Sequence, residues 1–524
     1  METTLKASLP PPSHTASSRG RAWVLAAVCL AALILPLSFT GGVVATPTIS
    51  RDLGGSSLAL NWITNAFMLS FGSLLMPAGA LADAFGRKRL FASGVLAFSI
   101  ASVIIAWAPD IAWLDALRAV QGIAAATALA GGSAALAQEF DGIARTRAFS
   151  LLGTSFGAGL AFGPVLAGLL IEHEGWRSMF LSSAFVGTFA LLLGVPRMRE
   201  SRDPDAMRFD WLGAVSFTGT LGLFTWGVLQ LPTSGWSSFQ AWGLIGGSLL
   251  AFAVFLRVER RTHRPMLDLS LFRYPRFVGV QMLPVATSYC YVVLLVVLPL
   301  RLIGIEGRNE VSAGLTMIAL SIPMLVMPSI AASLTRWASA GKISAAGLLI
   351  AALGLFWLSC IDPSNRQASL LGPLLVIGVG TGLPWGLMDG LAVSVVPKER
   401  AGMATGIFST ARVAGEGMAI AIVSALLTLF IQFHLPENIS TWRVATARHL
   451  AMGDMVAVES HVLDTVNTNA LVTVYGEAFQ WLIYFLILIT VFSAIVVGWL
   501  LGDQDRQHTD GCQTDNCFGS DNDP

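Results

Sequence analysis

The sequence is poor in charged residues. Only 12% of its 524 residues are Asp, Glu, Lys or Arg, whereas 54% are hydrophobic. Soluble globular domains carry about 25% charged residues, so this chain lacks the polar side chains that would cover a water-soluble particle. The 32 basic and 32 acidic residues balance, which leaves no net positive field to attract nucleic acid. We therefore expect the lipid bilayer to be the solvent for most of the chain.

Cysteine and histidine are also scarce, and this disfavours several kinds of site. Three of the five cysteines lie in apolar runs and two in the C-terminal tail, so they form no disulfide framework of the extracellular kind. The sequence has no cluster with the spacing of a metal site, no nucleophile motif, and no phosphate-binding loop of the form G-x-x-x-x-G-K-[ST]. It therefore predicts no metal and no cofactor, disfavours an enzyme, and excludes ATP as a driving force.

Long apolar runs are what the sequence has instead. A helix needs about 20 mainly apolar residues to cross the hydrocarbon core. The runs of that length are 22–45, 60–82, 90–108, 112–136, 147–171, 178–196, 211–231, 240–257, 277–303, 311–334, 343–361, 369–395, 401–432 and 478–501. They are continuously apolar, which excludes the alternating strands of a transmembrane β-barrel. We expect an all-α integral membrane protein with fourteen transmembrane helices.

Basic residues indicate the orientation of these helices. Most of the 32 Lys and Arg fall in segments that share a side with the N-terminus, and cytoplasmic loops carry such an excess. We expect a multi-pass protein of the cell membrane with both termini in the cytoplasm, residues 1–21 and 502–524 forming cytoplasmic tails and 1–21 being disordered. The longest segment on the outer side, 433–476, is too short for the folded domain of a membrane sensor.

Two charged segments, 197–210 and 258–276, divide the runs into six, two and six. Glycines recur in the fifth run of each six, where they let helices approach closely, as two halves related by a pseudo-twofold axis would require. We expect two pseudo-symmetric six-helix bundles plus two linking helices. Their bounds are 22–197 for the N-terminal bundle, 211–258 for the two additional helices, and 277–501 for the C-terminal bundle with its external loop 433–476.

The loop between the second and third runs combines glycine with clustered charge. It reads G-A-L-A-D-A-F-G-R-K-R-L over residues 79–90. The pattern fits a basic anchor with a tight turn, and it also fits a latch whose charges pair with neighbouring helix ends in one conformation only. The latch residues are Gly79, Asp83, Gly86, Arg87, Lys88 and Arg89.

This loop resembles the signature loop of the major facilitator superfamily, and other segments agree. Leu114, Arg118 and Gln121 fit the L-x-x-x-R-x-x-Q-G pattern of the family's fourth helix. The fifth run resembles its antiporter signature, which is associated with exporters. The matching residues are Gly159, Gly163, Pro164 and Gly168. Fourteen spans, the stretch Trp62–Phe67 and the segment Pro265–Leu269 resemble the fourteen-helix drug/proton antiporter branch.

One departure from that branch concerns the first run. The branch places an aspartate about nine residues before the proline at the end of this helix, whereas Ser38 stands there in this chain, ahead of Pro47. A hydroxyl cannot carry a proton across a membrane. A carboxylate elsewhere must therefore take this role, or coupling is absent.

Charged residues within the apolar runs are the candidates for proton coupling, because intramembrane charge is costly and usually functional. Arg118 shares a helix face with Gln121, and the alternative is that it satisfies backbone carbonyls. Asp389 lies in the twelfth run, where it is a proton or substrate carboxylate unless it is simply close to water. Arg412 and Glu416 lie four residues apart in the thirteenth run, so they can also neutralise each other as a structural pair.

Aromatic, methionine and amide side chains in the runs are candidates for an amphipathic substrate cavity, since such side chains suit apolar ligands of varied shape. Each of them taken alone is more typical of helix packing or of the membrane interface. The candidates are Asn65, Phe67, Met68, Gln121, Trp226, Gln281, Tyr289, Tyr291, Trp385 and Met388.

The sequence as a whole favours a proton-coupled efflux transporter, an antiporter that exports small, mostly apolar drugs, toxins or a secondary metabolite by alternating access. The alternatives are an uncoupled facilitator and a dedicated exporter of a siderophore or lipid. The expected partners are a small-molecule substrate, protons and the lipid bilayer, with no nucleic acid, and the protein is expected to be a monomer.

Overall fold

The computed structural model of the chain describes residues 18–140, 142–202, 210–234, 238–262, 267, 269–361, 369–395, 401–436, 443–455, 458 and 468–502. Within these ranges every regular element is a helix, and 14 spans are long and apolar enough to cross a membrane. The all-α fold with fourteen transmembrane helices that the sequence predicts is confirmed.

The first eight spans are each a single helix, and several begin at a polar cap. Ser56 accepts a hydrogen bond from the backbone N–H of Ala59 at the start of the second span, and Asp110 does the same for Trp113 at the start of the fourth. The bounds are α1 (Ser18–Leu53), α2 (Ser57–Phe85), α3 (Arg87–Ile105), α4 (Ile111–Glu139), α5 (Gly142–Glu174), α6 (Trp176–Gly194), α7 (Trp211–Ser234) and α8 (Phe239–Arg261).

The ninth span is not a regular α-helix. It contains two π-helical turns, and Pro284 and Pro299 within it supply no N–H group to the helix, which favours such a local rearrangement. The tenth span is likewise divided, at Pro323. The elements are α9 (Pro275–Thr287), η2 (Ser288–Val292), α10 (Val293–Pro299), η3 (Leu300–Ile305), α11 (Glu310–Ser321) and α12 (Pro323–Leu334), preceded by the short η1 (Leu269–Arg273).

The last span begins earlier than the sequence indicates. The remaining helices are α13 (Ala340–Ser359), α14 (Leu371–Ser394), α15 (Ala401–His434), α16 (Arg443–Ala451) and α18 (Thr468–Leu501). The external loop expected at 433–476 is therefore shorter at its C-terminal end. Leu471 and Tyr475 are buried in the first turns of α18, but Thr468, Asn469, Thr473 and Glu477 dilute the apolar signal of this part of the sequence.

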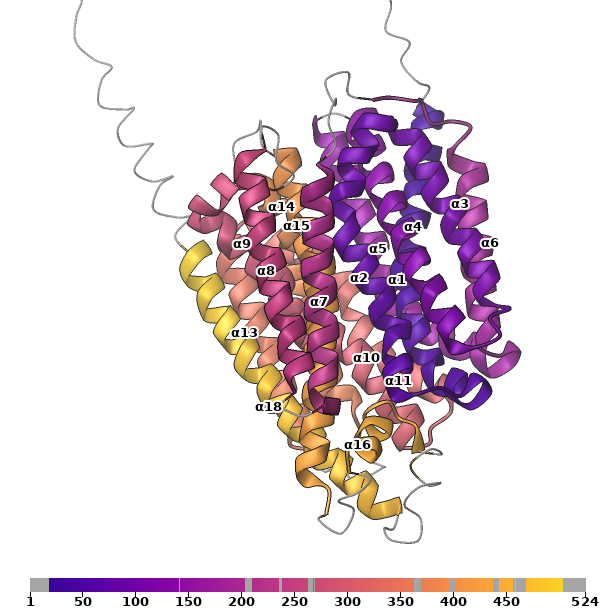
Figure 1. Cartoon of the computed structure of the whole chain (residues 1–524). Coiled ribbons are helices and arrows are strands. Elements are labelled where there is room, and N and C mark those ends of the chain that lie inside the picture. Colours follow the sequence, from indigo (N-terminus) through magenta and orange to yellow (C-terminus); the bar gives the residue numbers. More distant parts are fainter. Residues whose placement is uncertain are drawn as a thin grey trace, which may run out of the picture.

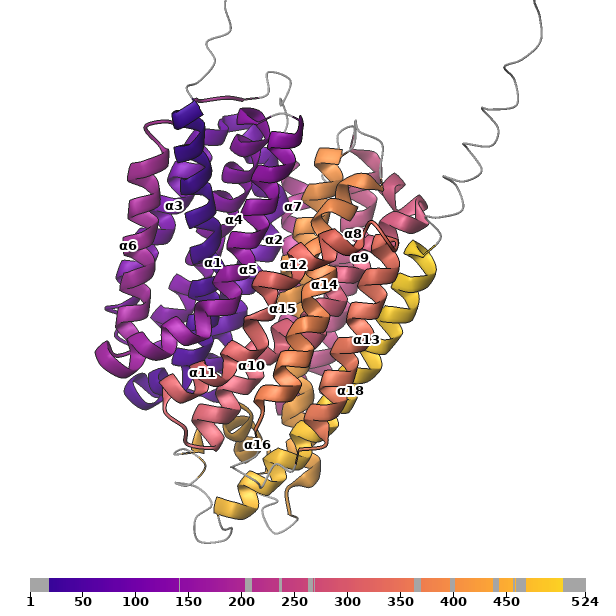
Figure 2. The same cartoon turned by 180° about the vertical axis from the view of Figure 1, so that it is seen from behind.

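Figures 1 and 2 show two groups of helices side by side, α1–α6 and α9–α18. The two most extensive contacts between the groups are those of α2 with α15 along one side and of α5 with α11 along the other. The linking helix α7 contacts both α2 and α15, and α8 packs on α7 (Figure 1). The linking pair thus covers the α2–α15 contact.

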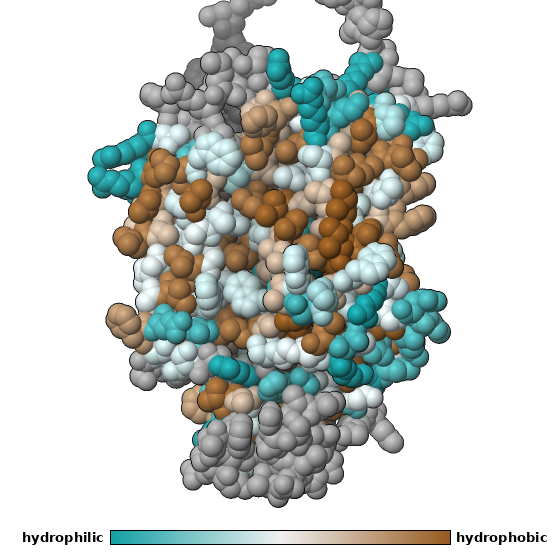
Figure 3. Space-filling view, turned by 45° about the vertical axis from the view of Figure 1, so that its right-hand side comes forward, coloured by the Kyte–Doolittle hydropathy of each residue, from teal (hydrophilic) through white to brown (hydrophobic). Residues whose placement is uncertain are grey.

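The two ends of the molecule differ. α1 begins and α18 ends at the same end, which we call the terminal face, whereas α16 lies at the opposite end, which we call the α16 face (Figure 1). Between them the surface is largely apolar, as Figure 3 shows for one side of the molecule. α8 is the least buried of the spans, and its side chains include Phe239 at 92% and Leu250 at 68% exposure. Such a belt suits contact with lipid.

Candidate functional site

Arg412 of α15 is the centre of a group of charged residues within the spans. Its Nη1 lies 3.4 Å from Oδ1 of Asp389 in α14, at the distance of an ion pair. The side chain of Arg412 is buried, whereas that of Asp389 is 46% exposed. The pair therefore joins a buried cation to a carboxylate that water can reach.

Glu416 lies one turn beyond Arg412 and is also buried, at 2% exposure. Its Oε1 and the Nε of Arg412 have no hydrogen-bond partner within the described ranges. Buried polar atoms without partners are rare and costly. The sequence favours a structural pair of Arg412 with Glu416, and this expectation is wrong: in the structure the ion pair of Arg412 is with Asp389, while Glu416 lies one turn further along α15.

The first group of helices reaches these charges through α5. The ring centre of Phe156 lies 5.0 Å from the guanidinium carbon of Arg412, within the range of a cation–π contact. A Cβ atom at Gly153 would lie only 3.3 Å from Oδ2 of Asp389. The bare glycine backbone thus lets the carboxylate approach α5. The buried charge therefore lies where the two groups of helices meet.

Arg118 lies inside the first group, fully buried. Its Nε donates to the carbonyl oxygen of Ile63 at 2.8 Å, and its Nη1 donates to Oε1 of Gln121 at 2.6 Å. The ring centre of Phe67 is 4.5 Å from the guanidinium carbon. Oγ of Ser38 lies 3.4 Å from Nη1, so the residue that replaces the branch's aspartate offers a neutral acceptor. Phe67 and Gln121, expected in a substrate cavity, surround this arginine.

Asp115 is a further candidate, which the family's sequence patterns do not include. It lies one turn before Arg118 on α4, so the two side chains share a helix face. Asp115 is half-buried, and its Oδ1 has no hydrogen-bond partner in the described part of the chain. The signal for Asp115 in the sequence is that an acidic residue interrupts the apolar run 112–136.

The loop between α2 and α3 pairs its charges within the first group. Nη2 of Arg87 lies 2.9 Å from Oδ1 of Asp83, and Nε of Arg89 lies 3.5 Å from Glu200, which follows α6. Glu200 also accepts the backbone N–H of Lys88 at 3.3 Å.

The two glycines of this loop differ in backbone conformation and in the space around them. Gly86 has φ +113°, which favours glycine, and a Cβ atom there would clash with Glu200. No atom lies within 4 Å of the corresponding position at Gly79. Gly86 is therefore required by the turn, since the Glu200 side chain could move away from a Cβ atom, whereas Gly79 is required by neither its backbone conformation nor packing.

The glycines of the fifth-helix signature face two different neighbours. Cβ atoms at Gly159 and Gly163 would collide with α1, and one at Gly168 would collide with the backbone of Glu310 in α11. Pro164 lies among them, inside α5. These positions let α5 pack against its own group on one side and against the opposite group on the other.

Hydrogen bonds join the two groups at the α16 face. Oγ1 of Thr48 in α1 donates to Glu310 at 3.1 Å, and Oγ of Ser50 donates to Asp454, which follows α16, at 3.0 Å. Gly453 has φ +71°, and a Cβ atom at Gly304 of η3 would collide with its backbone. The segment that carries α16 is thus held against both groups, and the α16 face is closed.

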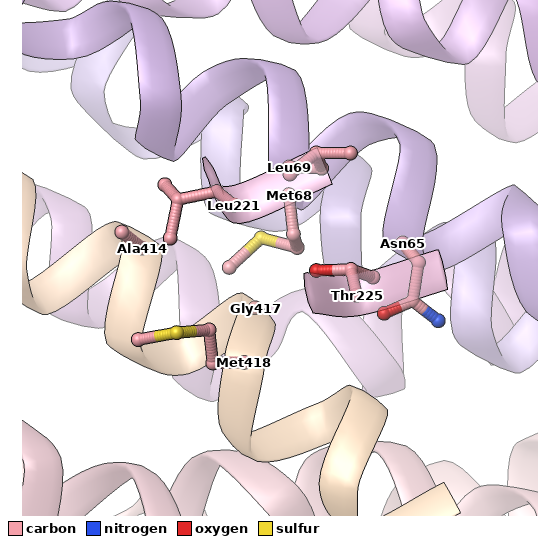
Figure 4. Close-up of a pocket in the computed structure, with 8 residues that line it drawn as sticks. All are labelled: Asn65, Met68, Leu69, Leu221, Thr225, Ala414, Gly417 and Met418. Carbon is pink, nitrogen blue, oxygen red and sulfur yellow. The ribbon is translucent and has the colours of Figure 1, made fainter. Parts of the chain in front are cut away.

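A pocket with about 230 Å³ of empty volume lies between α2, α7 and α15. Figure 4 shows side chains from the three helices facing it. Two of the predicted cavity residues line it, Asn65 and Met68. The complete lining is Asn65, Met68 and Leu69 of α2, Leu221 and Thr225 of α7, and Ala414, Gly417 and Met418 of α15.

The other predicted cavity residues lie elsewhere. The rings of Tyr291 and Trp385 are 6.1 Å apart, and both side chains are buried, as is Met388. Tyr289 packs against Phe485. The last two predicted cavity residues have different surroundings. The side-chain nitrogen and oxygen of Gln281 are buried without a partner among the described residues. Trp226 is 47% exposed on the outside of α7.

The chain matches the model of the Major Facilitator Superfamily over residues 28–420. It belongs to this superfamily. The puromycin resistance protein of Streptomyces alboniger is 31% identical over 459 residues, 85% of this chain and 90% of that protein. The tetracenomycin C resistance and export protein of Streptomyces glaucescens is 27% identical over 452 residues, 85% and 83% of the two chains.

Solved structures agree on the fold. A bacterial homologue of the human lysosomal transporter Spinster, in an inward-facing and unoccupied conformation, superposes with a TM-score of 0.61 at 16% identity, covering 92% of this chain and 97% of that one. With its family and fold established, the protein is a multi-span membrane transporter and not an enzyme.

Proposed function

We propose that this superfamily member is a proton-coupled exporter of small, mostly apolar drugs, toxins or secondary metabolites, and that it works by alternating access. The observation that carries the proposal is the arrangement of Arg412 between the half-exposed Asp389 and the buried Glu416, at the contact with α5. The names of relatives that confer resistance to or export antibiotics support the direction and the class of cargo.

The coupling cycle follows from these charges. When Asp389 takes up a proton, its attraction for Arg412 falls, and the guanidinium is left with Glu416 as its nearest acidic neighbour on α15. Because Gly153 and Phe156 of α5 touch this group, a change in charge acts on the contact between the two halves, α1–α6 and α9–α18. Protonation from outside favours cargo release and reset, and deprotonation inside favours loading. Each charge that crosses the membrane gains about 2.3 kcal/mol per 100 mV.

The proposal also includes the orientation of the protein in the membrane. We place the terminal face in the cytoplasm, because the basic loops lie there, and the α16 face outside. In this arrangement the closed α16 face corresponds to a conformation loaded from the cytoplasm. The protein acts as a monomer in the cell membrane, with its cargo and protons as partners.

Ser38 favours one alternative, a facilitator that does not couple to protons. Arg118 is surrounded by a carbonyl, an amide, a hydroxyl and an aromatic ring. Asp115 lies one turn away, but among the described residues no carboxylate forms an ion pair with Arg118 that protonation would break. This alternative requires that Asp389, Arg412 and Glu416 stabilise the fold and take no part in proton transfer.

Accumulation of a panel of dyes and antibiotics tests the proposal, in cells with and without the protein and with and without a protonophore. We expect lower accumulation in cells with the protein, and loss of that difference with the protonophore. Proteoliposomes with an imposed pH gradient then isolate the direct effect. Cargo movement that ignores the gradient would establish the facilitator, and no movement of any cargo would remove the export function.

A further inference from the structure

The two acids beside Arg412 differ in what surrounds them. Asp389 forms the ion pair, with its Oδ1 3.4 Å from Nη1 of the guanidinium. Glu416 is 2% exposed, and its Oε1 has no hydrogen-bond partner among the described residues. Of the helices packed against α15, α14 contributes Asp389, and in the described part of the chain no charge other than Arg412 acts on Glu416. Glu416 therefore lies beside a guanidinium that another acid already holds.

The count of charges in this group favours a proton on Glu416. One cation with two ionised acids would leave a net negative charge beside a buried side chain. A buried ionised carboxylate without hydrogen bonds is costly, whereas the same group with its proton is neutral and far easier to bury. With the proton on Glu416, the three residues Asp389, Arg412 and Glu416 are neutral together.

Arg412 imposes the opposite arrangement when Asp389 takes up a proton. Its side chain is buried, so without an acid partner the guanidinium would be a buried charge that nothing compensates. Glu416 lies one turn away on the same helix face, and the Nε of Arg412 has no hydrogen-bond partner among the described residues. Once ionised, Glu416 can replace Asp389 as the partner, and Nε is a donor available for this second pair.

The two acids also lie at different depths. α14 ends at the terminal face, and Asp389 lies near that end (Figure 1). α15 runs in the opposite direction, so Glu416 is one turn further from the terminal face than Arg412. A proton that passes from Glu416 to Asp389 therefore moves toward the terminal face and reaches a carboxylate that is 46% exposed.

We propose that Glu416 and Asp389 share one proton and take turns as the partner of Arg412. In the conformation closed at the α16 face, the proton is on Glu416 and the ion pair is with Asp389. In the exchange, an O–H bond breaks at Glu416 and one forms at Asp389, while the guanidinium passes from Asp389 to Glu416. The group stays neutral, and the proton belongs to the pair of acids. This inference rests on the proposed function and adds where the transported proton is held.

Infrared spectroscopy of the purified full-length protein tests the proton on Glu416, because a protonated carboxyl group has a carbonyl stretch that an ionised one lacks. The protein is kept at neutral pH, without cargo, in a detergent that contains no ester groups. We expect Glu416→Gln to lose one such band. Glu174→Gln is the matched control at the exposed end of α5, and its spectrum should keep the band. Identical carboxyl bands in Glu416→Gln and the unsubstituted protein would overturn the proposal.

The variant Asp389→Asn tests the exchange itself. Arg412 then has Glu416 as its remaining acid partner, so Glu416 should be ionised. The same band should disappear, although Glu416 is still present. A band that persists in Asp389→Asn shows that the two acids do not share the proton, and the proposal then fails.

Thermal unfolding gives a second readout that needs no spectral assignment. Each acid can replace the other beside Arg412, so the double variant Asp389→Asn/Glu416→Gln should lower the unfolding midpoint by more than the sum of the two single variants. Additive losses contradict the sharing. Both measurements are made without a gradient. Export that follows the gradient in a protein without the band refutes this inference alone, and export that ignores the gradient in a protein with the band refutes the proposed function alone.

Discussion

Arg412 is the cation around which the charge of the second half is arranged. It lies between an acid that is 46% exposed, Asp389, and one that is 2% exposed, Glu416. In the proposed cycle this difference in exposure assigns the two acids different tasks, because Asp389 is the one that water can reach. The buried acid is the one that stays close to the guanidinium on its own helix.

Asp389→Asn should stop gradient-driven export while folded protein remains in the membrane. Because Arg412 is buried, losing its partner costs more than the about 0–1 kcal/mol of a surface pair, but because Asp389 is 46% exposed it costs less than the about 3–5 kcal/mol of a fully buried one. Export is measured as dye efflux, and folding as the thermal unfolding midpoint of the purified protein. Asp389→Glu keeps a titrating group and should retain part of the activity. Full efflux in Asp389→Asn removes this residue from the mechanism.

Arg118→Ala should reduce proton release that follows addition of cargo to the purified protein. The substitution leaves the acceptors Ile63 and Gln121 without their donor, at about 1–3 kcal/mol for each unpaired group, so Arg118→Lys, which keeps the charge, is the companion variant. Proton release is followed with a pH-sensitive dye in weakly buffered solution. Release that is unchanged in Arg118→Ala would leave this arginine with a structural role alone.

Positions of intramembrane charge could be predicted at the residue scale, but their partners could not. Asp389, Arg412 and Glu416 were marked because they interrupt apolar runs. The Arg412–Asp389 pair joins two different helices, and only packing decides which residues meet across them. Packing also decides where Phe67 and Gln121 lie. Their side chains would suit a substrate cavity, but in the structure they surround Arg118. Asp115 interrupts the apolar run 112–136 in the same way.

At the scale of helices, glycine determines how closely the two halves approach. Gly72 of α2 lies against Ala414 of α15, and Gly168 of α5 lies against Glu310 of α11. These are the contacts on the two sides of the molecule. Because lipid supplies no hydrophobic drive between helices, close backbone approach is a main source of their affinity.

Gly72→Ala should destabilise the protein by about 1–3 kcal/mol, because the added methyl group has no room beside the α15 backbone. Gly79→Ala is the matched control on the same helix, where nothing lies within 4 Å of the new Cβ atom. It should be neutral or stabilise by about 0.5–1 kcal/mol, since alanine suits a helix better than glycine does. Thermal unfolding in one detergent compares the two. A smaller loss in Gly72→Ala than in Gly79→Ala would contradict this account of the contact.

The sequence predicts which segments form helices more completely than it predicts their shape. Apolar length alone indicates the fourteen spans, since an unsatisfied backbone is too costly in lipid. The π-helical turns of the ninth span and the break at Pro323 depend on how proline is accommodated by neighbours. The start of α18 at Thr468 depends on burial of Leu471 and Tyr475, which becomes visible only when the opposing helices are in place.

For the whole molecule, closure of the α16 face is the feature that any transport cycle must undo. Ser50 of the first half is hydrogen bonded to Asp454 of the second, and Thr48 to Glu310. Alternating access requires that such contacts break once in each cycle.

A short crosslink across this face should therefore stop transport. Ser50→Cys and Asp454→Cys are combined in a background whose native cysteines are replaced, and a short bis-thiosulfonate reagent joins them. We expect dye efflux to cease after treatment and to return when a reducing agent cleaves the link. Each single variant serves as a control, because it takes up the reagent without joining the halves. Continued efflux from the linked protein contradicts opening at this face.

α1 begins and α18 ends at the terminal face, and we expect this face to lie in the cytoplasm. Tags fused to the N-terminus and to the C-terminus should both resist protease in intact cells and both be cleaved in inverted membrane vesicles. Cleavage of one tag alone would contradict an even number of crossings, and cleavage of both in intact cells would invert the orientation.

The tight Gly304–Gly453 contact ties the segment behind α16 to η3 while Ser50 ties it to α1. α16 itself is largely buried, with Thr446, Ala447, Leu450 and Ala451 inside, so this short helix is part of the closure rather than a passive connector. With the α16 face outside the cell, as proposed, an antibody fragment that bound this face and held these contacts together would inhibit transport without entering the cell and without competing with the cargo.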